Sequence, residues 1–282
     1  MNVHAAADSW YATTANAAPA RGALQGTVDC DVCVVGGGIA GCSAALHLAE
    51  RGYRVILLEQ HRIGWGASGR SGAQAIFGLA IGQDKLSGII GSTDARKAFD
   101  VSVEGLELLK SLIARHHIEC DWVAGQAHAA MKPRQDRELR RWAEDLHTQY
   151  GYRSVRMLER SELRQYIASE RYSSALLDSA GGHLHPLNYT LGLAAVAEAA
   201  GARVYEHSRA HSYQRLGPGD SATSNVRVRT ETGQVRCRQL LFCGNAWLGD
   251  TVPALVRKII AVGTYIVATE PLGESRARAL LP

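Results

Sequence analysis

The sequence contains no stretch that is long and uncharged enough to cross a lipid bilayer. Its first residues also lack the basic start and continuous apolar core of a secretory signal. We therefore expect no transmembrane segment and predict a cytoplasmic location. Charge of one sign is not in large excess either, because 31 Lys and Arg against 27 Asp and Glu leave a net charge of +4. Basic residues gather only near Lys132, where acids are interleaved, so we expect a solvated helix face and no nucleic-acid binding.

The sequence has few cysteines, and they are scattered. Such spacing favours small buried residues in a reducing compartment over a disulfide framework. We predict no metal site. A convincing acid–base pair is also missing, which leaves the catalytic residues unassigned. The six cysteines are Cys30, Cys33, Cys42, Cys120, Cys237 and Cys243.

The composition that is present is that of a folded protein. The chain has 282 residues, 46% of them apolar and 21% charged, enough for one large domain or two ordinary ones. Residues 31–35, "DVCVV", predict a buried strand, residues 39–52 an apolar helix, and "RVILLE", residues 54–59, a second buried strand. Together they predict a βαβ unit with parallel strands.

Glycines occupy the turn between that strand and helix. Gly36, Gly38 and Gly41 fit the pattern G-x-G-x-x-G, in which the glycines allow a tight turn, an approaching pyrophosphate and close helix packing. Free amides at Ile39 and Ala40 would meet the pyrophosphate at the positive end of the helix. The sequence therefore predicts a dinucleotide site.

The second strand ends in Glu59, whose carboxylate can accept hydrogen bonds from ribose hydroxyls and would repel a 2′-phosphate. This favours FAD or NAD over NADP. The following "GWGASGRSGAQ", residues 64–74, offers more unhindered amides and hydroxyls than a nicotinamide fold usually has there, which favours FAD; the alternative is a mobile surface loop.

Further along, helical spacing predicts helices near 94–116, 134–151 and 187–201. We expect strand and turn at 120–131 and a hairpin over 172–186 that turns at Gly181 and Gly182. A continuous strand is expected over 203–216, a hairpin turning at Thr232 and Gly233, and a last strand within 263–273, "GTYIVATEPLG".

At this point the motifs carry a resemblance. The segments "VVGGGIAGCSAALHLAERGYRVILLE", "GASGRSGAQ", "GGHLHPLNYTLGLAAVAEAAGARVYE" and "FCGNAWLGDTVP" are similar to the D-amino-acid oxidase superfamily of FAD-dependent oxidoreductases. The resemblance covers only the front part of such a protein, since members continue past the position of Pro282. Ser71 and Ala73 depart from it, standing where asparagine and glycine are frequent.

The resemblance implies an α/β fold with two domains. An FAD-binding Rossmann-like domain with a parallel sheet would use residues 28–118 and 183–256, after an N-terminal arm of residues 1–27. An incomplete α+β substrate domain on an antiparallel sheet would use residues 119–182 and 257–282.

It also implies cofactor contacts, residue by residue. The pyrophosphate turn would be Gly36, Gly38, Ile39, Ala40 and Gly41, and the ribose end Glu59 and Gln60. The loop toward the flavin ring would be Ala67, Ser68, Gly72, Ala73 and Gln74. His211 would give a backbone contact to adenine, and Gly244 would lie in the turn that closes on the dinucleotide.

The implied activity is oxidation of an amine or amino-acid-like substrate by hydride transfer to flavin N5, with γ-glutamylputrescine, a metabolite of polyamine catabolism, as the expected substrate. Oxygen or another acceptor would take the electrons. The alternatives are an amino-acid dehydrogenase that passes electrons to a quinone or carrier, and a truncated FAD-binding fragment without activity. Candidate substrate-side residues are His183, His185 and Arg70, each also explained by a structural role.

Overall fold

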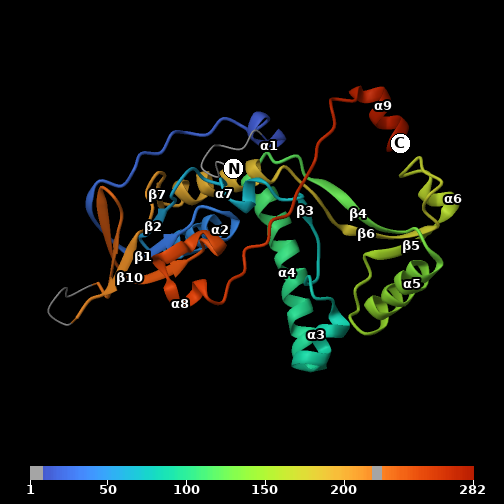
Figure 1. Cartoon of the computed structure of the whole chain (residues 1–282), viewed down its shortest axis with the longest axis horizontal. Coiled ribbons are helices and arrows are strands. Elements are labelled where there is room, and N and C mark those ends of the chain that lie inside the picture. Colours follow the sequence, from blue (N-terminus) through green and yellow to red (C-terminus); the bar gives the residue numbers. More distant parts are fainter. Residues whose placement is uncertain (1–8, 218–223) are drawn as a thin grey trace. The chain divides into compact units, whose positions relative to one another are not determined.

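A computed structural model of the chain describes residues 9–217 and 224–282. The chain forms two compact units, each built from discontinuous segments (Figure 1). Unit 1 comprises residues 1–72, 116–120 and 185–265, and unit 2 comprises residues 73–115, 121–184 and 266–282.

Unit 1 is built on a six-stranded sheet with strand order β7-β2-β1-β10-β9-β8. Strands β7, β2, β1 and β10 pair in parallel, whereas β9 pairs antiparallel with both of its neighbours, β10 and β8. The predicted βαβ unit is confirmed as β1, α2 and β2. The elements of this unit are α1 (Trp10–Thr13), β1 (Gly26–Val35), α2 (Ile39–Glu50), β2 (Val55–Leu58), the 3-10 helix η1 (Ala67–Gly69), α7 (Pro186–Ala199), β7 (Arg203–Tyr205), β8 (Ser212–Arg215), β9 (Val226–Arg229), β10 (Gly233–Phe242), the 3-10 segment η2 (Asn245–Thr251) and α8 (Pro253–Val256).

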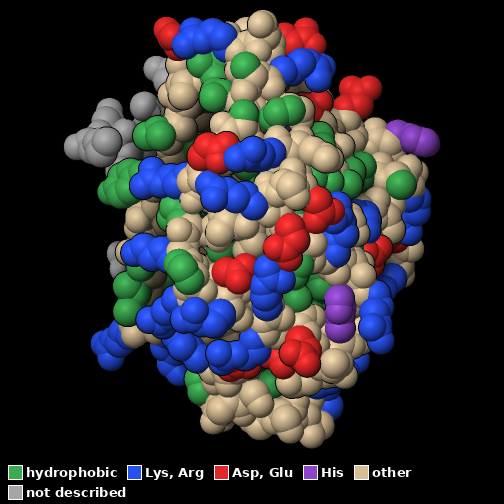
Figure 2. Space-filling view, turned by 90° about the vertical axis from the view of Figure 1, so that its right-hand side faces the viewer, with side chains coloured by type: hydrophobic (Ala, Val, Ile, Leu, Met, Phe, Trp, Pro, Cys, Tyr) green, Lys and Arg blue, Asp and Glu red, His purple; other side chains and the backbone are tan. Residues whose placement is uncertain are grey.

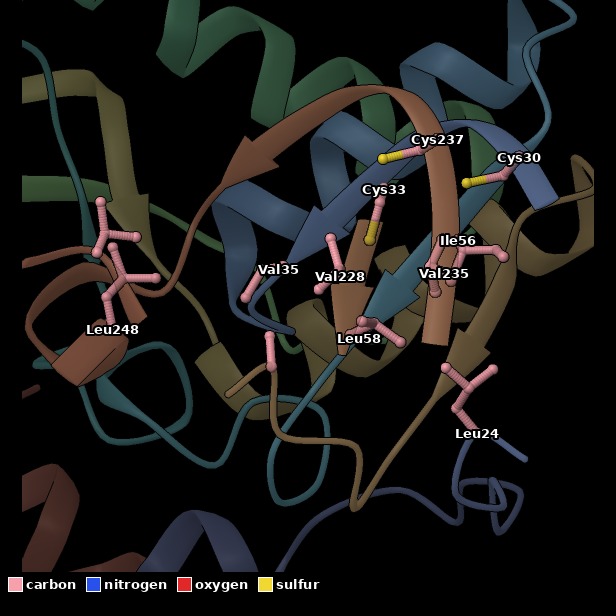
Figure 3. Close-up of a cluster of buried hydrophobic side chains, with 12 residues drawn as sticks. Leu24, Cys30, Cys33, Val35, Ile56, Leu58, Val228, Val235, Cys237 and Leu248 are labelled. Atoms are coloured by element: carbon pink, nitrogen blue, oxygen red, sulfur yellow. The ribbon is translucent and has the colours of Figure 1, made fainter. Parts of the chain in front are cut away.

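One buried cluster in the core of unit 1 joins the central strands to the N-terminal arm (Figure 3). Val35, Ile56 and Leu58 extend from neighbouring parallel strands, and Leu24 of the arm is fully buried in the same cluster. Three thiols, those of Cys30, Cys33 and Cys237, are also part of it. Helix α2 packs against α7.

Unit 2 contains an antiparallel sheet of strand order β3-β6-β4, with β5 also paired to β6. An aromatic group that includes Phe77, Phe99 and Tyr152 packs with Leu146 and Leu176 to form its main core. The elements are β3 (Gln74–Ala75), α3 (Gln83–Ile90), α4 (Ser92–His116), β4 (Val123–Ala130), α5 (Pro133–Thr148), β5 (Val155–Glu159), α6 (Arg160–Leu163), β6 (Ser174–His183) and α9 (Gly273–Leu280). Parallel and antiparallel sheets together confirm the predicted α/β class.

The predicted hairpin at Gly181 and Gly182 is wrong. Both glycines lie inside the continuous strand β6. A Cβ at Gly182 would come within 2.3 Å of the Val123 carbonyl oxygen and 2.8 Å of the Trp122 ring. Glycine is used here because neighbouring groups approach the backbone closely, a role that the sequence does not distinguish from a turn.

Two other predicted strands also differ. The continuous strand over 203–216 is broken between β7 and β8, where Glu206 and Ser208 are buried and His207 has a left-handed φ of 50°. Residues 263–273 form no strand with the described part of the chain, and Tyr265 and Val267 are more than nine-tenths exposed. Alternation predicts a strand, but a strand also needs a partner for its ladder.

The predicted domain boundaries remain a prediction, and the division into units differs from them mainly at residues 73–115. The sequence prediction assigns this segment to the cofactor domain, but it belongs to unit 2. The reason is packing, since Phe77 and Phe99 lie in the aromatic core with Tyr152.

The basic stretch after Lys132 forms α5, and two of its arginines pair with acids on the same helix. Arg134 lies 2.8 Å from Glu138, and Arg140 lies 3.1 Å from Asp136. Basic and acidic side chains are likewise interspersed on the face shown in Figure 2. Within residues 9–217 and 224–282, no helix is long and apolar enough to cross a membrane.

Candidate functional site: a dinucleotide cavity

The glycine turn between β1 and α2 is enclosed by backbone. Gly36 has a φ of 115°, and a Cβ there would lie 2.7 Å from the carbonyl carbon of Cys243. A Cβ at Gly41 would lie 1.9 Å from the Gly36 carbonyl oxygen, so only glycine lets α2 start this close to the turn. The structure therefore supports the predicted mechanical roles of both glycines.

An oxygen atom already occupies the anion-binding position at the start of α2. The backbone N–H of Ile39 donates to Ser68 Oγ at 3.0 Å. Ser68 lies in η1, and its hydroxyl lies 2.7 Å from where a Cβ of Gly38 would be. A phosphate oxygen accepts hydrogen bonds at this kind of helix terminus, so the turn fits a pyrophosphate.

Glu59 follows β2 and is buried beside the turn. Its carboxylate accepts hydrogen bonds from the amides of Gly37, at 2.7 Å, and His61, at 2.8 Å. Burial raises the pKa of Glu59; the His61 and Gly37 amides lower that pKa, and the carboxylate of Glu206 raises it further. Each carboxylate oxygen has a second lone pair, so Glu59 can still accept from ribose hydroxyls.

These groups border a cavity of about 620 Å³ whose lining lies within unit 1. This volume is in the range of small-molecule and cofactor pockets. Eight of the predicted cofactor residues line it, namely Gly36, Gly38, Ala40, Glu59, Gln60, Ala67, Ser68 and Gly244.

Six predicted residues do not line the cavity: Ile39, Gly41, Gly72, Ala73, Gln74 and His211. Ile39 and Gly41 still shape it through the contacts described above. Ala73, with a left-handed φ of 66°, and Gln74, which begins β3, belong to unit 2. The amide of His211 donates to the Arg229 carbonyl and its ring lies 2.8 Å from Glu231, and its backbone contact to adenine remains a prediction.

The sequence prediction missed other parts of the cavity wall. Arg209 and Ala210 line it just before His211, and Thr251 of η2 donates to the Ala210 carbonyl at 2.7 Å. The break in the predicted strand moves these two residues to the cavity, and no periodicity marks such a break. Further lining residues are Val35, Gly37, Leu58, Trp65, Gly66, Cys243, Asn245, Ala246, Trp247, Leu248, Ile260, Ala261, Val262 and Gly263.

Aromatic side chains form one wall. Trp65 packs edge-on to Trp247, with ring centroids 5.3 Å apart, and the His61 ring lies 4.0 Å from Trp65 on centroids. The guanidinium of Arg70 lies over the Trp65 ring at 4.5 Å. Arg70 thus has a cation–π contact, a structural role that its sequence position left open.

The two histidines predicted as substrate-side candidates lie at the ends of secondary-structure elements. His183 ends β6, and His185 is the N-cap of α7, where Nδ1 accepts from the Asn188 amide at 3.1 Å. Its Nε2 lies 3.1 Å from Thr14 Oγ1 of the N-terminal arm. His185 therefore has a capping role.

The glycine turn, the helix terminus, the carboxylate after β2 and the cavity together fit an adenine dinucleotide. The family described as FAD dependent oxidoreductase matches residues 31–282. The chain belongs to that family. FAD is thus its cofactor, as predicted, and the resemblance to FAD-dependent oxidoreductases is confirmed.

Curated relatives extend the match. The chain is 40% identical to γ-glutamylputrescine oxidoreductase of Escherichia coli (strain K12) over 97% of this chain and 63% of that protein. It is 37% identical to the probable oxidoreductase OrdL of Haemophilus influenzae over 89% of this chain and 58% of the relative. The chain therefore spans about three-fifths of the length of these relatives.

Solved structures support the fold. L-Amino acid deaminase from Proteus myxofaciens superposes with a TM-score of 0.67 at 22% identity, covering 83% of this chain and 49% of that one. Glycine oxidase from Geobacillus kaustophilus gives a TM-score of 0.61 at 20% identity, covering 79% and 57%. At such identities the likeness concerns the fold alone.

Proposed function

We propose that the chain forms the cofactor-binding part of an enzyme that oxidises an amine or amino-acid-like substrate with bound FAD. The observation that carries this proposal is the cavity of unit 1, where the glycine turn, Ser68 and Glu59 meet. The E. coli relative, which is named for γ-glutamylputrescine, supports that compound as the first substrate to test.

A bound flavin supplies the redox chemistry by accepting a hydride from the substrate. The chain's residues hold and orient it. The Ile39 amide and the α2 terminus would bind the pyrophosphate once Ser68 yields its hydrogen bond, and Glu59 would accept from the ribose. Trp65 and Trp247 would present an aromatic wall to the bound group. This chemistry requires no protein nucleophile, which is compatible with the missing acid–base pair.

The test is the visible absorption spectrum of the purified chain, recorded before and after anaerobic addition of γ-glutamylputrescine. Flavin bands that lose intensity on addition would support both the cofactor and the reaction. Flavin bands that persist would retain FAD binding and argue against this substrate or against activity of the chain alone. A chain that neither carries nor takes up FAD would contradict the proposal.

The electron acceptor is a separate part of the proposal. If oxygen takes the electrons, the reduced protein reoxidises in air and consumes oxygen with substrate alone. If a quinone or carrier takes them, as in the alternative dehydrogenase, turnover requires an added dye or quinone. An oxygen electrode, with and without an artificial acceptor, distinguishes the two.

A further inference from the structure

A buried ion pair fixes the N-terminal arm to the body of unit 1. The side chain of Arg21 is only 4% exposed. Its Nε and Nη2 donate to the two carboxylate oxygens of Glu198, on α7, at 2.9 and 2.7 Å. Its Nη1 lies 3.6 Å from Glu206 Oε1 and makes no hydrogen bond. The Arg21 guanidinium therefore hydrogen-bonds to one carboxylate, that of Glu198, and lies within ion-pair distance of a second, that of Glu206.

Glu206 links this ion pair to the cofactor cavity. Its side chain is 6% exposed, and Oε1 accepts from the Ile63 amide at 2.9 Å. The Ser208 hydroxyl donates to the Glu206 carbonyl, and the Ser208 amide donates to the Glu59 carbonyl at 2.8 Å. The arm joins the same network, because the Leu24 amide donates to Ser208 Oγ.

Without Arg21, the negative charges of Glu198 and Glu206 would lose the cation that lies between them. Glu206 acts on Glu59 with a like charge. The thiol of Cys42, which burial keeps neutral by raising its pKa, is within electrostatic reach of Glu59, Arg21 and Glu198. The titratable groups around this volume are Cys42 of α2, Glu198 of α7, Glu206 after β7, His61 after β2, Arg209 in the cavity wall, Cys243 after β10 and Arg21 of the arm. Of the two arginines, Arg21 is the one that lies beside Glu206, at 3.6 Å.

We propose that Arg21 is a positioning residue for the cofactor: its charge balances Glu206 behind Glu59, so that Glu59 stays ionised as an acceptor for the ribose hydroxyls. The inference rests on the proposed FAD site. Arg21 acts through Glu206 and Glu59, without touching the cavity. Loss of its charge leaves Glu206 to repel the Glu59 carboxylate, which then holds its proton to higher pH.

The test is FAD affinity, measured by flavin fluorescence titration from about pH 4 to pH 9, a window that starts near the usual glutamate pKa of about 4.3 and extends upward because burial raises the pKa of Glu59. For the wild type we expect affinity to rise with pH as Glu59 ionises. Arg21→Met should move the midpoint of this rise upward by about one pH unit. Arg21→Lys keeps the charge and should keep the midpoint, whereas Glu206→Gln removes the like charge and should move the midpoint down.

Two controls separate this effect from a general loss of structure. In a Glu59→Gln background the midpoint should vanish, and Arg21→Met should then add no pH-dependent change. Arg54→Gln removes a surface ion pair with Asp31 in the same unit and should leave the midpoint in place.

The inference is overturned if Arg21→Met weakens FAD binding by the same factor at every pH. It is also overturned if Arg21→Met still changes the pH dependence of FAD binding in the Glu59→Gln background. If Arg21→Met does not fold, Arg21→Lys and Glu206→Gln decide the question, and an unmoved midpoint in Glu206→Gln overturns it. A wild-type chain that binds no FAD contradicts the proposed function as well; a wild type that binds FAD with unshifted variants contradicts only the role of Arg21.

Discussion

Gly41 shows how a single hydrogen atom in place of a methyl group decides whether the cofactor turn can close. Gly41→Ala would put a Cβ 1.9 Å from the Gly36 carbonyl oxygen, and backbone has to move to relieve the clash. We expect the substitution to lower the free energy of unfolding by roughly 2–4 kcal/mol. Urea denaturation of the purified protein measures the loss.

Gly105 provides the matched control, because it also lies within a helix, α4, and a Cβ there would meet nothing within 4 Å. Gly105→Ala should stabilise the protein by about 0.5–1 kcal/mol through helix propensity. If both alanines changed stability alike, the close approach at Gly41 would not be the cause.

His128 gives stability a pH dependence that can be traced to one ring. It lies on β4 beside Gln126 and edge-on to Trp142, at 5.0 Å between centroids. Burial lowers the pKa of His128, and Asp178 opposes this only in part. In the unfolded chain the ring protonates near its usual pKa of about 6.5, before the folded form does, so stability is full above that pH and falls as the pH drops below it.

The measurement is the urea midpoint at several pH values between about 5 and 8, compared between wild type and His128→Gln. The difference between the two proteins should shrink as the pH falls, because the variant lacks the titrating ring. Parallel curves would show that His128 does not titrate in this way.

Among the secondary-structure elements, α7 depends on an unusual cap. His185 Nδ1 accepts the Asn188 amide, and Nε2 contacts Thr14 of the arm. His185→Ala removes both contacts and should lower the free energy of unfolding by roughly 1–2 kcal/mol. Thermal and urea unfolding measure this loss.

Two variants divide the role of His185. His185→Asn keeps a side-chain oxygen at the N-cap and should recover most of the loss, while Thr14→Val removes only the arm contact and should cost less than His185→Ala. Equal losses in His185→Ala and His185→Asn would show that capping contributes little.

The elements that the sequence predicts well are those with local causes. The strand, glycine turn and helix at residues 31–52 follow from short-range periodicity and turn chemistry, and so does the hairpin at Thr232 and Gly233. Gly182 and the break after Tyr205 were predicted wrongly because their causes are contacts with distant residues such as Trp122 and Leu24 of the arm. For the same reason the place of Glu59 in the cavity wall could be predicted, because it directly follows a strand of the βαβ unit. The places of Arg209 and Trp247 could not be predicted, because these residues reach the cavity only through tertiary folding.

For the whole molecule, the cavity lining lies in one of the two compact units, which predicts where FAD acts. A ligand that binds only the folded form stabilises it by about 2.7 kcal/mol at a hundredfold excess over its Kd. Hydrogen exchange read by mass spectrometry should therefore slow at the glycine turn and at Arg209 and Ala210 when FAD is added, and stay unchanged in α5 and β5. Equal slowing across both units would contradict a cofactor site with this lining.

The pairing of β1 with β10 also has a consequence during synthesis on the ribosome. Residues of these neighbouring strands, such as Thr27 and Gln234, are 207 positions apart in the chain. At bacterial-type elongation rates of about 5–20 residues per second, β10 emerges roughly 10–40 s after β1. Through that interval the nascent chain exposes one unpaired edge of an apolar strand, so chaperone binding to residues 26–35 would be timed by translation of the remaining chain.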